Sequence, residues 1–184
     1  MRIIKFSNLE TVPWKNGGGV TREIADFREQ GNIIWRLSMA DVANDGPFSS
    51  FVGLTRVLTV IEGNGIVLST ENRKLEAVLG APVTFDGGQT TQSKLIDGPI
   101  RDFNVMFDPL ECHAEVIHVN GPLHLILRAN AKRCIAALGL RGETRIHCNC
   151  SLHFGDTVLV ESGSIELDLT DKVSALIVTI NMLD

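Results

Sequence analysis

Glycine-containing turns recur at short, regular intervals along this chain, and this feature constrains the fold more than any other. Runs rich in Val, Ile, Thr, Leu and Phe lie between the turns. Short strands at such a spacing are typical of a β-sandwich or β-barrel. No convincing window repeats apolar residues at helical spacing, and only residues 129–137 could hold a helical turn. The sequence therefore predicts an all-β fold. The turns fall at residues 17–19, 44–47, 62–65, 86–88, 97–99, 120–122 and 162–163.

The two halves of the chain weakly repeat one another. Residues 58–68 read as a strand, a glycine turn and a second strand, and residues 135–146 repeat that order. Many cupin barrels run this way, and no Pro- or Ser-rich linker separates the halves. We predict a single domain over residues 1–184, built as a bicupin. Two stacked double-stranded β-helices of the RmlC-like cupin type would occupy residues 1–108 and 109–184.

Length and charge limit the partners of the chain. Its 184 residues suffice to bury a core. The formal net charge is −5 without a Lys/Arg cluster, which argues against nucleic acid and anionic membranes. No apolar run is long enough to span a bilayer. Residues 1–6 read as a strand rather than a signal peptide, so we expect a cytoplasmic protein. The sequence leaves the oligomeric state open, a homodimer included.

Histidine spacing argues against a metal site and hence against a metal cofactor. A cupin metal site uses two His separated by one residue, because strand alternation then points both toward one ion. No two of the five histidines are so spaced, and none lies in the first half. His147 and His153 flank Cys148 and Cys150, but on a strand they would lie roughly 20 Å apart. We expect no metal or other cofactor. The cysteines read as reduced, partly buried thiols.

A candidate anion site appears where polar and apolar residues alternate. In residues 33–40, Trp35, Leu37 and Met39 share one face, and Arg36 shares the other with Ser38 and Ala40. Small residues around one guanidinium leave room for a carboxylate, which Arg binds with two parallel hydrogen bonds. The alternative is an Arg36 at a barrel rim, paired with Glu23 or Asp26.

Two further segments supply polar groups to the same predicted sheet. Thr21 and Glu23 share a face, as do Asp102, Asn104 and Met106. Asn104 lies between apolar neighbours, so we expect it to be buried and to need hydrogen-bond partners. The glycines at 17–19 lack the Lys and Ser/Thr that follow them in a phosphate loop. They form either a tight turn requiring positive φ or a pocket rim with exposed N–H groups.

Taken together, these segments resemble the HutD/Ves family. The matching blocks occur in the family's order over the first 107 residues, and the remainder shares only the strand pattern. The blocks are Trp14–Gly19, Thr21–Ile24, Trp35–Ala40, Asp45–Ser49, Gly53–Arg56, Glu62-Gly63 and Asp102–Met106.

The resemblance implies a cupin-like double barrel, usually without metal. HutD proteins are associated with bacterial histidine utilisation and are proposed to bind a pathway intermediate such as formylglutamate. Ves-type relatives are linked to environmental stress without a settled activity, and the sequence does not select the branch. A pair of Arg residues with neutral donors suits a small dicarboxylate. The predicted ligand-binding residues are Asn16, Thr21, Glu23, Arg36, Ser38, Arg56 and Asn104.

Three functions remain open, and the sequence favours binding without catalysis. The first is a metal-free protein that binds a small carboxylate and modulates histidine utilisation. The second is a metal-independent cupin enzyme of the isomerase or epimerase type. Such an enzyme needs a general base, and without His in the first half Glu23 or Asp102 would have to serve. The third is a structural or interaction protein with a filled, vestigial barrel.

Overall fold

The computed structural model describes residues 1–147 and 150–183, and its described residues form strands and one 3-10 turn without an α-helix. The chain divides into two compact units. We call Glu10–Cys112 the N-unit. Met1–Leu9 together with the residues from His113 onward form the C-unit. The all-β prediction is confirmed, and no helix among the described residues is long and apolar enough to cross a membrane.

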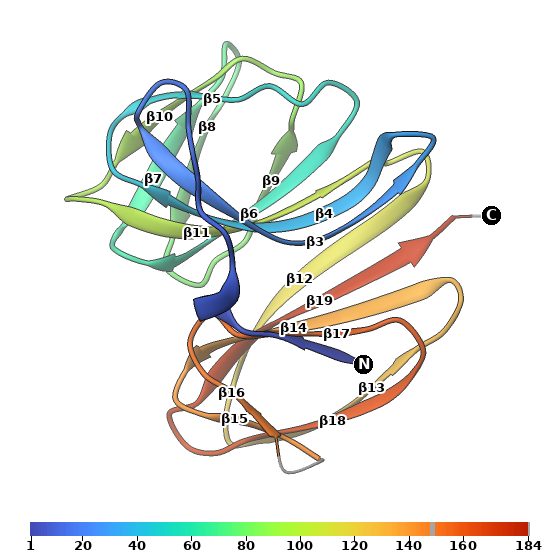
Figure 1. Ribbon diagram of the computed structural model, residues 1–184. Coiled ribbons are helices and arrows are strands. Elements are labelled where there is room, and N and C mark those ends of the chain that lie inside the picture. The colour runs from blue at the N-terminus through green and yellow to red at the C-terminus, as the bar shows by residue number, and fades with distance from the viewer. Residues whose placement is uncertain (148–149, 184) are drawn as a thin grey trace. The chain divides into compact units, whose positions relative to one another are not determined.

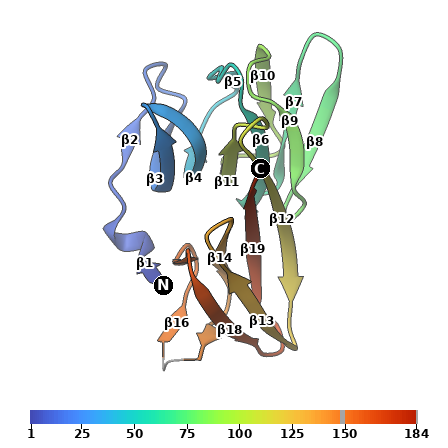
Figure 2. The same ribbon diagram turned by 90° about the vertical axis from the view of Figure 1, so that its right-hand side faces the viewer.

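The N-unit consists of two antiparallel sheets (Figure 1). The six-stranded sheet runs in the order β2 (Val12–Pro13), β3 (Gly19–Glu29), β4 (Asn32–Val42), β11 (Ile100–Phe107), β6 (Thr55–Glu62) and β9 (Val83–Asp86). The four-stranded sheet runs β5 (Gly46–Phe48), β10 (Thr91–Leu95), β7 (Gly65–Ser69) and β8 (Lys74–Val78). Figure 2 shows β10, β7 and β8 side by side.

The C-unit also consists of two antiparallel sheets. Its five-stranded sheet runs β1 (Arg2–Ile4), β17 (Thr157–Val160), β14 (Arg133–Arg141), β19 (Ser174–Met182) and β12 (Cys112–Asn120). Its four-stranded sheet runs β13 (Leu123–Ala129), β18 (Gly163–Leu169), β15 (Thr144–Ile146) and β16 (Cys150–Leu152).

Both units use the same order of eight strands. In the N-unit, β4-β11-β6-β9 form most of one sheet and β5-β10-β7-β8 form the other. Adding eight to each number gives β12-β19-β14-β17 and β13-β18-β15-β16, which are the C-unit sheets apart from β1. The predicted echo therefore corresponds to equivalent strands: β6 and β7 in the first repeat, and β14 and β15 in the second.

Each unit has its own apolar core, shared by its two sheets. In the N-unit, Leu58 and Val60 of the six-stranded sheet pack with Ile66 and Leu68 of the four-stranded sheet. The C-unit core joins β14 and β19 to β15, β16 and β18, with Ile135 and Leu167 among its members. Burial of these alternating side chains removes apolar surface from water and holds each pair of sheets together.

Two local expectations were wrong. Residues 129–137 contain no helical turn, because Asn130 and Arg133 exchange backbone hydrogen bonds at 2.9 Å and close a tight turn between β13 and β14. The first strand ends at Ile4, and the 3-10 turn η1 (Phe6–Asn8) follows. Cys112 is buried, Cys134 and Cys150 are partly buried, and Cys148 lies outside the described residues.

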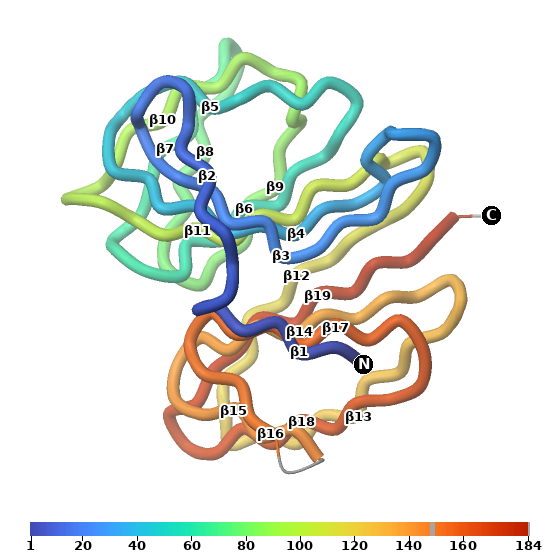
Figure 3. The backbone as a smooth tube through the Cα atoms, viewed as in Figure 1, coloured from blue at the N-terminus to red at the C-terminus, as the bar shows by residue number. Residues whose placement is uncertain are grey.

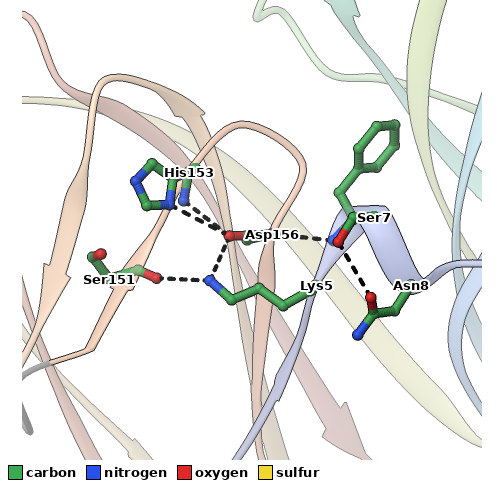
Figure 4. A network of polar contacts seen from close by, with 7 residues as sticks. Lys5, Ser7, Asn8, Ser151, His153 and Asp156 are labelled. Atoms are coloured by element: carbon green, nitrogen blue, oxygen red, sulfur yellow. Dashed lines mark hydrogen bonds and ion pairs between the residues drawn. The ribbon is translucent and has the colours of Figure 1, made fainter.

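The first nine residues belong to the C-unit, and β1 pairs with β17 (Figure 3). A buried carboxylate anchors them (Figure 4). Asp156 Oδ2 accepts from Lys5 Nζ at 2.8 Å and from the His153 N–H at 3.2 Å, while Oδ1 accepts from the Phe6 N–H at 3.0 Å. Burial acts to raise the pKa of Asp156, but these hydrogen bonds and the Lys5 charge bring it below 3.8. The anchor therefore depends on the ionised carboxylate.

Candidate functional site

Three cross-strand rows place polar side chains on the inner face of the six-stranded sheet. Residues paired in register point to the same side of a sheet, so the pairing defines which side chains meet. The rows are Arg36–Met106–Arg56, Ser38–Asn104–Leu58 and Ala40–Asp102–Val60 across β4, β11 and β6. Leu58 and Val60 join the apolar core beside these polar groups.

The polar rows line a cavity of about 60 Å³ within the N-unit. An outer groove of about 480 Å³ shares three lining residues with it: Trp14, Phe48 and Ser49. The N-unit therefore contains a small cavity beside its apolar core. Five predicted ligand-binding residues line the cavity, namely Thr21, Arg36, Ser38, Arg56 and Asn104.

Arg56 is the buried cation of this cavity, with an exposed fraction of 4%. Its guanidinium carbon lies 5.1 Å from the ring centres of Phe48 and Phe85 and 5.6 Å from that of Phe51. Aromatic faces attract a cation and stabilise a desolvated guanidinium. Burial lowers the pKa of Arg56 to about 10; Asp102 opposes this shift, and repulsion from Arg36 adds to it. Arg56 therefore stays charged at neutral pH.

An amide separates the Arg56 cation from a buried acid. Arg56 Nη2 donates to Asn104 Oδ1 at 2.9 Å, and Asn104 Nδ2 donates to Asp102 Oδ1. Asn104 is 3% exposed, so the prediction that it is buried and hydrogen-bonded is confirmed. Asp102 is fully buried, and burial raises its pKa to about 7 despite the attraction of Arg56. Strongly shifted acids in a cavity mark candidate functional groups.

Arg36 is the second cation, placed at the edge of the cavity. Its Nε donates to Glu23 Oε2 at 2.5 Å, and its side chain is 15% exposed. Nη1 lies 4.0 Å from Met106 Sδ. Arg36 therefore pairs with Glu23, which was one of the two sequence interpretations. It also lines the cavity, where an anion site was the other interpretation. Glu23 itself does not line the cavity, and its side chain is 46% exposed.

The glycine loop positions the indole that borders both cavity and groove. Trp14 Nε1 donates to Thr21 Oγ1 at 2.7 Å. A Cβ at Gly19 would overlap the Asp41 carbonyl oxygen and approach the Trp14 ring, so only glycine fits there. Gly17 has φ +71° and the Gly18 N–H donates to Asn16 Oδ1 at 3.0 Å, as expected of a tight turn. Asn16 lines the outer groove rather than the cavity.

Sequence reasoning did not assign several lining residues to the site. Strand alternation placed Asp102 on one face with Asn104 and named it as a substitute base but not as a ligand-binding residue, and its complete burial depends on neighbouring strands. Phe48, Ser49 and Phe51 lie in or just after β5, opposite the polar rows, and they reach the cavity only through the pairing of the two sheets. Trp14 and Met106 carried the family resemblance without an assigned role.

The C-unit differs from the N-unit at the strands that correspond to β6 and β11. At the corresponding strands of the C-unit, the inward side chains are Ile135 and Ala137 of β14 and Ala175 and Ile177 of β19, all within the apolar core. Among residues 1–147 and 150–183, no three His, Cys, Asp or Glu side chains gather into a group that could hold a metal ion. His147 and His153 approach different carboxylates, Glu166 at 3.6 Å and Asp156 at 3.7 Å.

Comparison with known proteins finds relatives both in structure and in sequence. A HutD protein of Pseudomonas fluorescens SBW25, solved in a formate condition, superposes with a TM-score of 0.86 at 29% identity, covering 100% of this chain and 99% of that one. An uncharacterised 21.2 kDa protein in the hutC 3' region of Pseudomonas putida is 33% identical over 140 residues, 74% of each chain. Protein Ves of Escherichia fergusonii is 38% identical over 119 residues, 61% of this chain and 62% of Ves.

More distant structures share the fold alone. The bacterial pirin YhhW of Escherichia coli, solved with nickel(II), has a TM-score of 0.72 at 10% identity and covers 99% of both chains. The fold is accordingly cupin-like. The family model described as HutD matches residues 7–177, which takes in most of both units. The chain therefore belongs to the HutD family.

Proposed function

We propose that the N-unit cavity binds the carboxylate group of a small organic acid. Two guanidinium groups, those of Arg36 and Arg56, line one small cavity and repel each other, and this arrangement is the main support for the proposal. A bound anion would relieve this repulsion and would gain charge-assisted hydrogen bonds. Arg56 Nε has no hydrogen-bond partner among the described residues, so it is available to a ligand.

The sizes of the two hollows suggest how a larger acid would bind. The cavity of about 60 Å³ suits one carboxylate group, whereas the outer groove of about 480 Å³ suits the rest of the molecule. Lys15 and Asn16 line that groove and offer a cation and an amide to a second polar end. Formylglutamate, a dicarboxylate suggested by the family, fits this division. Binding without turnover would let the protein modulate histidine utilisation.

We also propose a finer description of the fold of each unit. Each unit would be one cupin jelly roll, which makes the chain a bicupin. The identical order of eight strands in the two units supports this description.

Acid–base catalysis is the second candidate function, and Asp102 favours it. A carboxylic acid with a pKa of about 7 is well matched to proton transfer near neutral pH. The cavity lining contains no histidine, so Asp102 would act as the acid or base of a metal-independent isomerase or epimerase. Incubation of the protein with candidate acids in D₂O, followed by NMR, distinguishes the two functions. Exchange or conversion of the ligand would favour catalysis, and an unchanged ligand favours binding alone.

Thermal unfolding in the presence of urocanate, formiminoglutamate, formylglutamate and glutamate tests the proposal. A ligand at a hundred times its dissociation constant stabilises by about 2.7 kcal/mol, which raises the Tm of a chain this size by about 5–11 °C. We expect formylglutamate to raise Tm in the wild type and not in Arg36→Ala. Arg128→Gln, at an exposed position on β13, is the matched control and should retain the rise. No rise with any acid would refute a role in binding histidine-pathway acids, and a rise retained in Arg36→Ala would place the ligand elsewhere.

A further inference from the structure

We infer that Asp102 binds the ligand as a neutral carboxylic acid that donates a hydrogen bond from Oδ2, so that ligand binding takes up a proton. This inference rests on the proposed carboxylate site and adds a residue that determines its specificity. Asp102 was not among the predicted ligand-binding residues.

The two oxygens of the Asp102 carboxyl group differ in their hydrogen bonding. Asp102 is fully buried and lines the cavity. Its Oδ1 accepts from Asn104, whereas Oδ2 has no hydrogen-bond partner among the described residues. A buried carboxylate oxygen without a partner is costly, and a proton on that oxygen removes most of the cost. The same proton makes Oδ2 a hydrogen-bond donor, and in the proposed complex an oxygen of the ligand accepts that hydrogen bond.

One cation and one anion on neighbouring strands act on Asp102. Arg56 on β6 is the neighbouring cation and acts to lower the pKa of Asp102, but its Nη2 donates to Asn104 Oδ1. Asp41 on β4 also acts on Asp102 and raises its pKa. The Asp41 carboxylate pairs with Arg22 at 2.6 Å and Arg101 at 2.5 Å.

The other groups that line the cavity around Asp102 add one cation and no anion. Arg36 lies at the edge, and the remaining lining side chains are uncharged. An incoming carboxylate would therefore meet two cations and Asp102. If Asp102 were ionised, the two anions would repel each other in a cavity shielded from water, as in paired acids that share one proton. Proton uptake replaces this repulsion with a hydrogen bond.

This arrangement defines the class of ligand. Guanidinium groups and a protonated acid all donate hydrogen bonds, so the cavity favours a group that only accepts them. A carboxylate meets this requirement, whereas the corresponding primary amide presents N–H groups toward donors. The site should therefore bind an acid and discriminate against its amide.

Isothermal titration calorimetry with formylglutamate, and with formate as the smallest carboxylate, tests the inference. Titrations at about pH 8 in two buffers of different ionisation enthalpy give the number of protons taken up. We expect close to one proton per ligand in the wild type and a dissociation constant that rises about tenfold per pH unit between about pH 8 and 9. Asp102→Asn should bind without proton uptake, and Asp171→Asn, at an exposed position, should behave as the wild type.

Each outcome decides between the proposals. Binding without proton uptake in the wild type would overturn the role of Asp102 and leave the carboxylate site intact. If neither formylglutamate nor formate binds, both the proposed carboxylate site and the role of Asp102 are refuted. The two-buffer measurement on the wild type is decisive even if Asp102→Asn does not fold. Proton uptake retained in a folded Asp102→Asn would assign the proton to another group and refute the inference.

Discussion

Replacing Asp102 with asparagine should change how the stability of the protein depends on pH. The folded state raises the pKa of Asp102 from 3.8 to about 7 because the side chain is buried away from water. Between these values the folded protein holds a proton that the unfolded chain has released. Stability contributed by the neutral acid is therefore complete below about pH 4 and decreases as the pH rises toward 7.

The magnitude follows from the size of the shift. A difference of about three pKa units at about 1.4 kcal/mol each corresponds to about 4 kcal/mol of unfolding free energy. Asp102→Asn keeps the size of the side chain and an oxygen that can accept from Asn104, but it does not titrate. Relative to the wild type, the variant should gain up to about 4 kcal/mol between pH 4 and pH 8.

Urea unfolding of both proteins at matched pH values measures this difference. Other carboxylates titrate alike in the two proteins, so their contributions cancel in the comparison. A difference that stays constant across the range would refute the burial argument, because it would mean that Asp102 titrates alike in the folded and unfolded chain. A wild type that gains stability over the variant with rising pH would indicate direct pairing of Asp102 with Arg56. The carboxyl chemical shift of Asp102, followed by NMR, gives the pKa independently.

Three further changes test the surroundings of the site and the N-terminal anchor. Asn104→Leu removes the amide between Arg56 and Asp102, and the resulting unpaired polar atoms should lower the unfolding free energy by about 2–3 kcal/mol in urea unfolding. Gly19→Ala should cost about 1–3 kcal/mol by overpacking, measured by Tm, whereas Gly46→Ala, where a Cβ meets nothing within 4 Å, should cost less. Asp156→Ala should cost about 2 kcal/mol at pH 7 and speed amide exchange at Phe6; the cost should shrink below pH 3.8, since the pKa of Asp156 is lowered and its contribution is lost on protonation.

The two units show how one strand order can serve two roles. In the N-unit, β6 and β11 direct Arg56, Asp102 and Asn104 toward the cavity, whereas the equivalent β14 and β19 contribute Ile135, Ala137, Ala175 and Ile177 to an apolar core. Replacing polar with apolar residues at inward positions fills the interior and stabilises it without altering the backbone pairing.

The sequence by itself determined the all-β class, and it named five of the residues that line the N-unit cavity. Strand alternation and glycine turns are local properties, so they can be read from consecutive residues. The same alternation placed Arg36 with Ser38 and Asn104 with Asp102 on shared faces. The interpretation of Glu23 as a direct ligand-binding residue was less informative, because its side chain pairs with Arg36 and does not line the cavity.

Only the tertiary structure decided which side chains meet at the N-unit cavity, how their charges are arranged and to which unit the first nine residues belong. The opposite wall of the cavity includes Phe48 and Phe51, which meet β6 only because the two sheets share a core. The raised pKa of Asp102 depends on burial by several strands, and the attachment of β1 depends on Asp156 more than a hundred residues away in the chain. Burial, charge interactions and long-range strand pairing each depend on residues that are distant in the sequence. A local pattern in the chain therefore does not predict them.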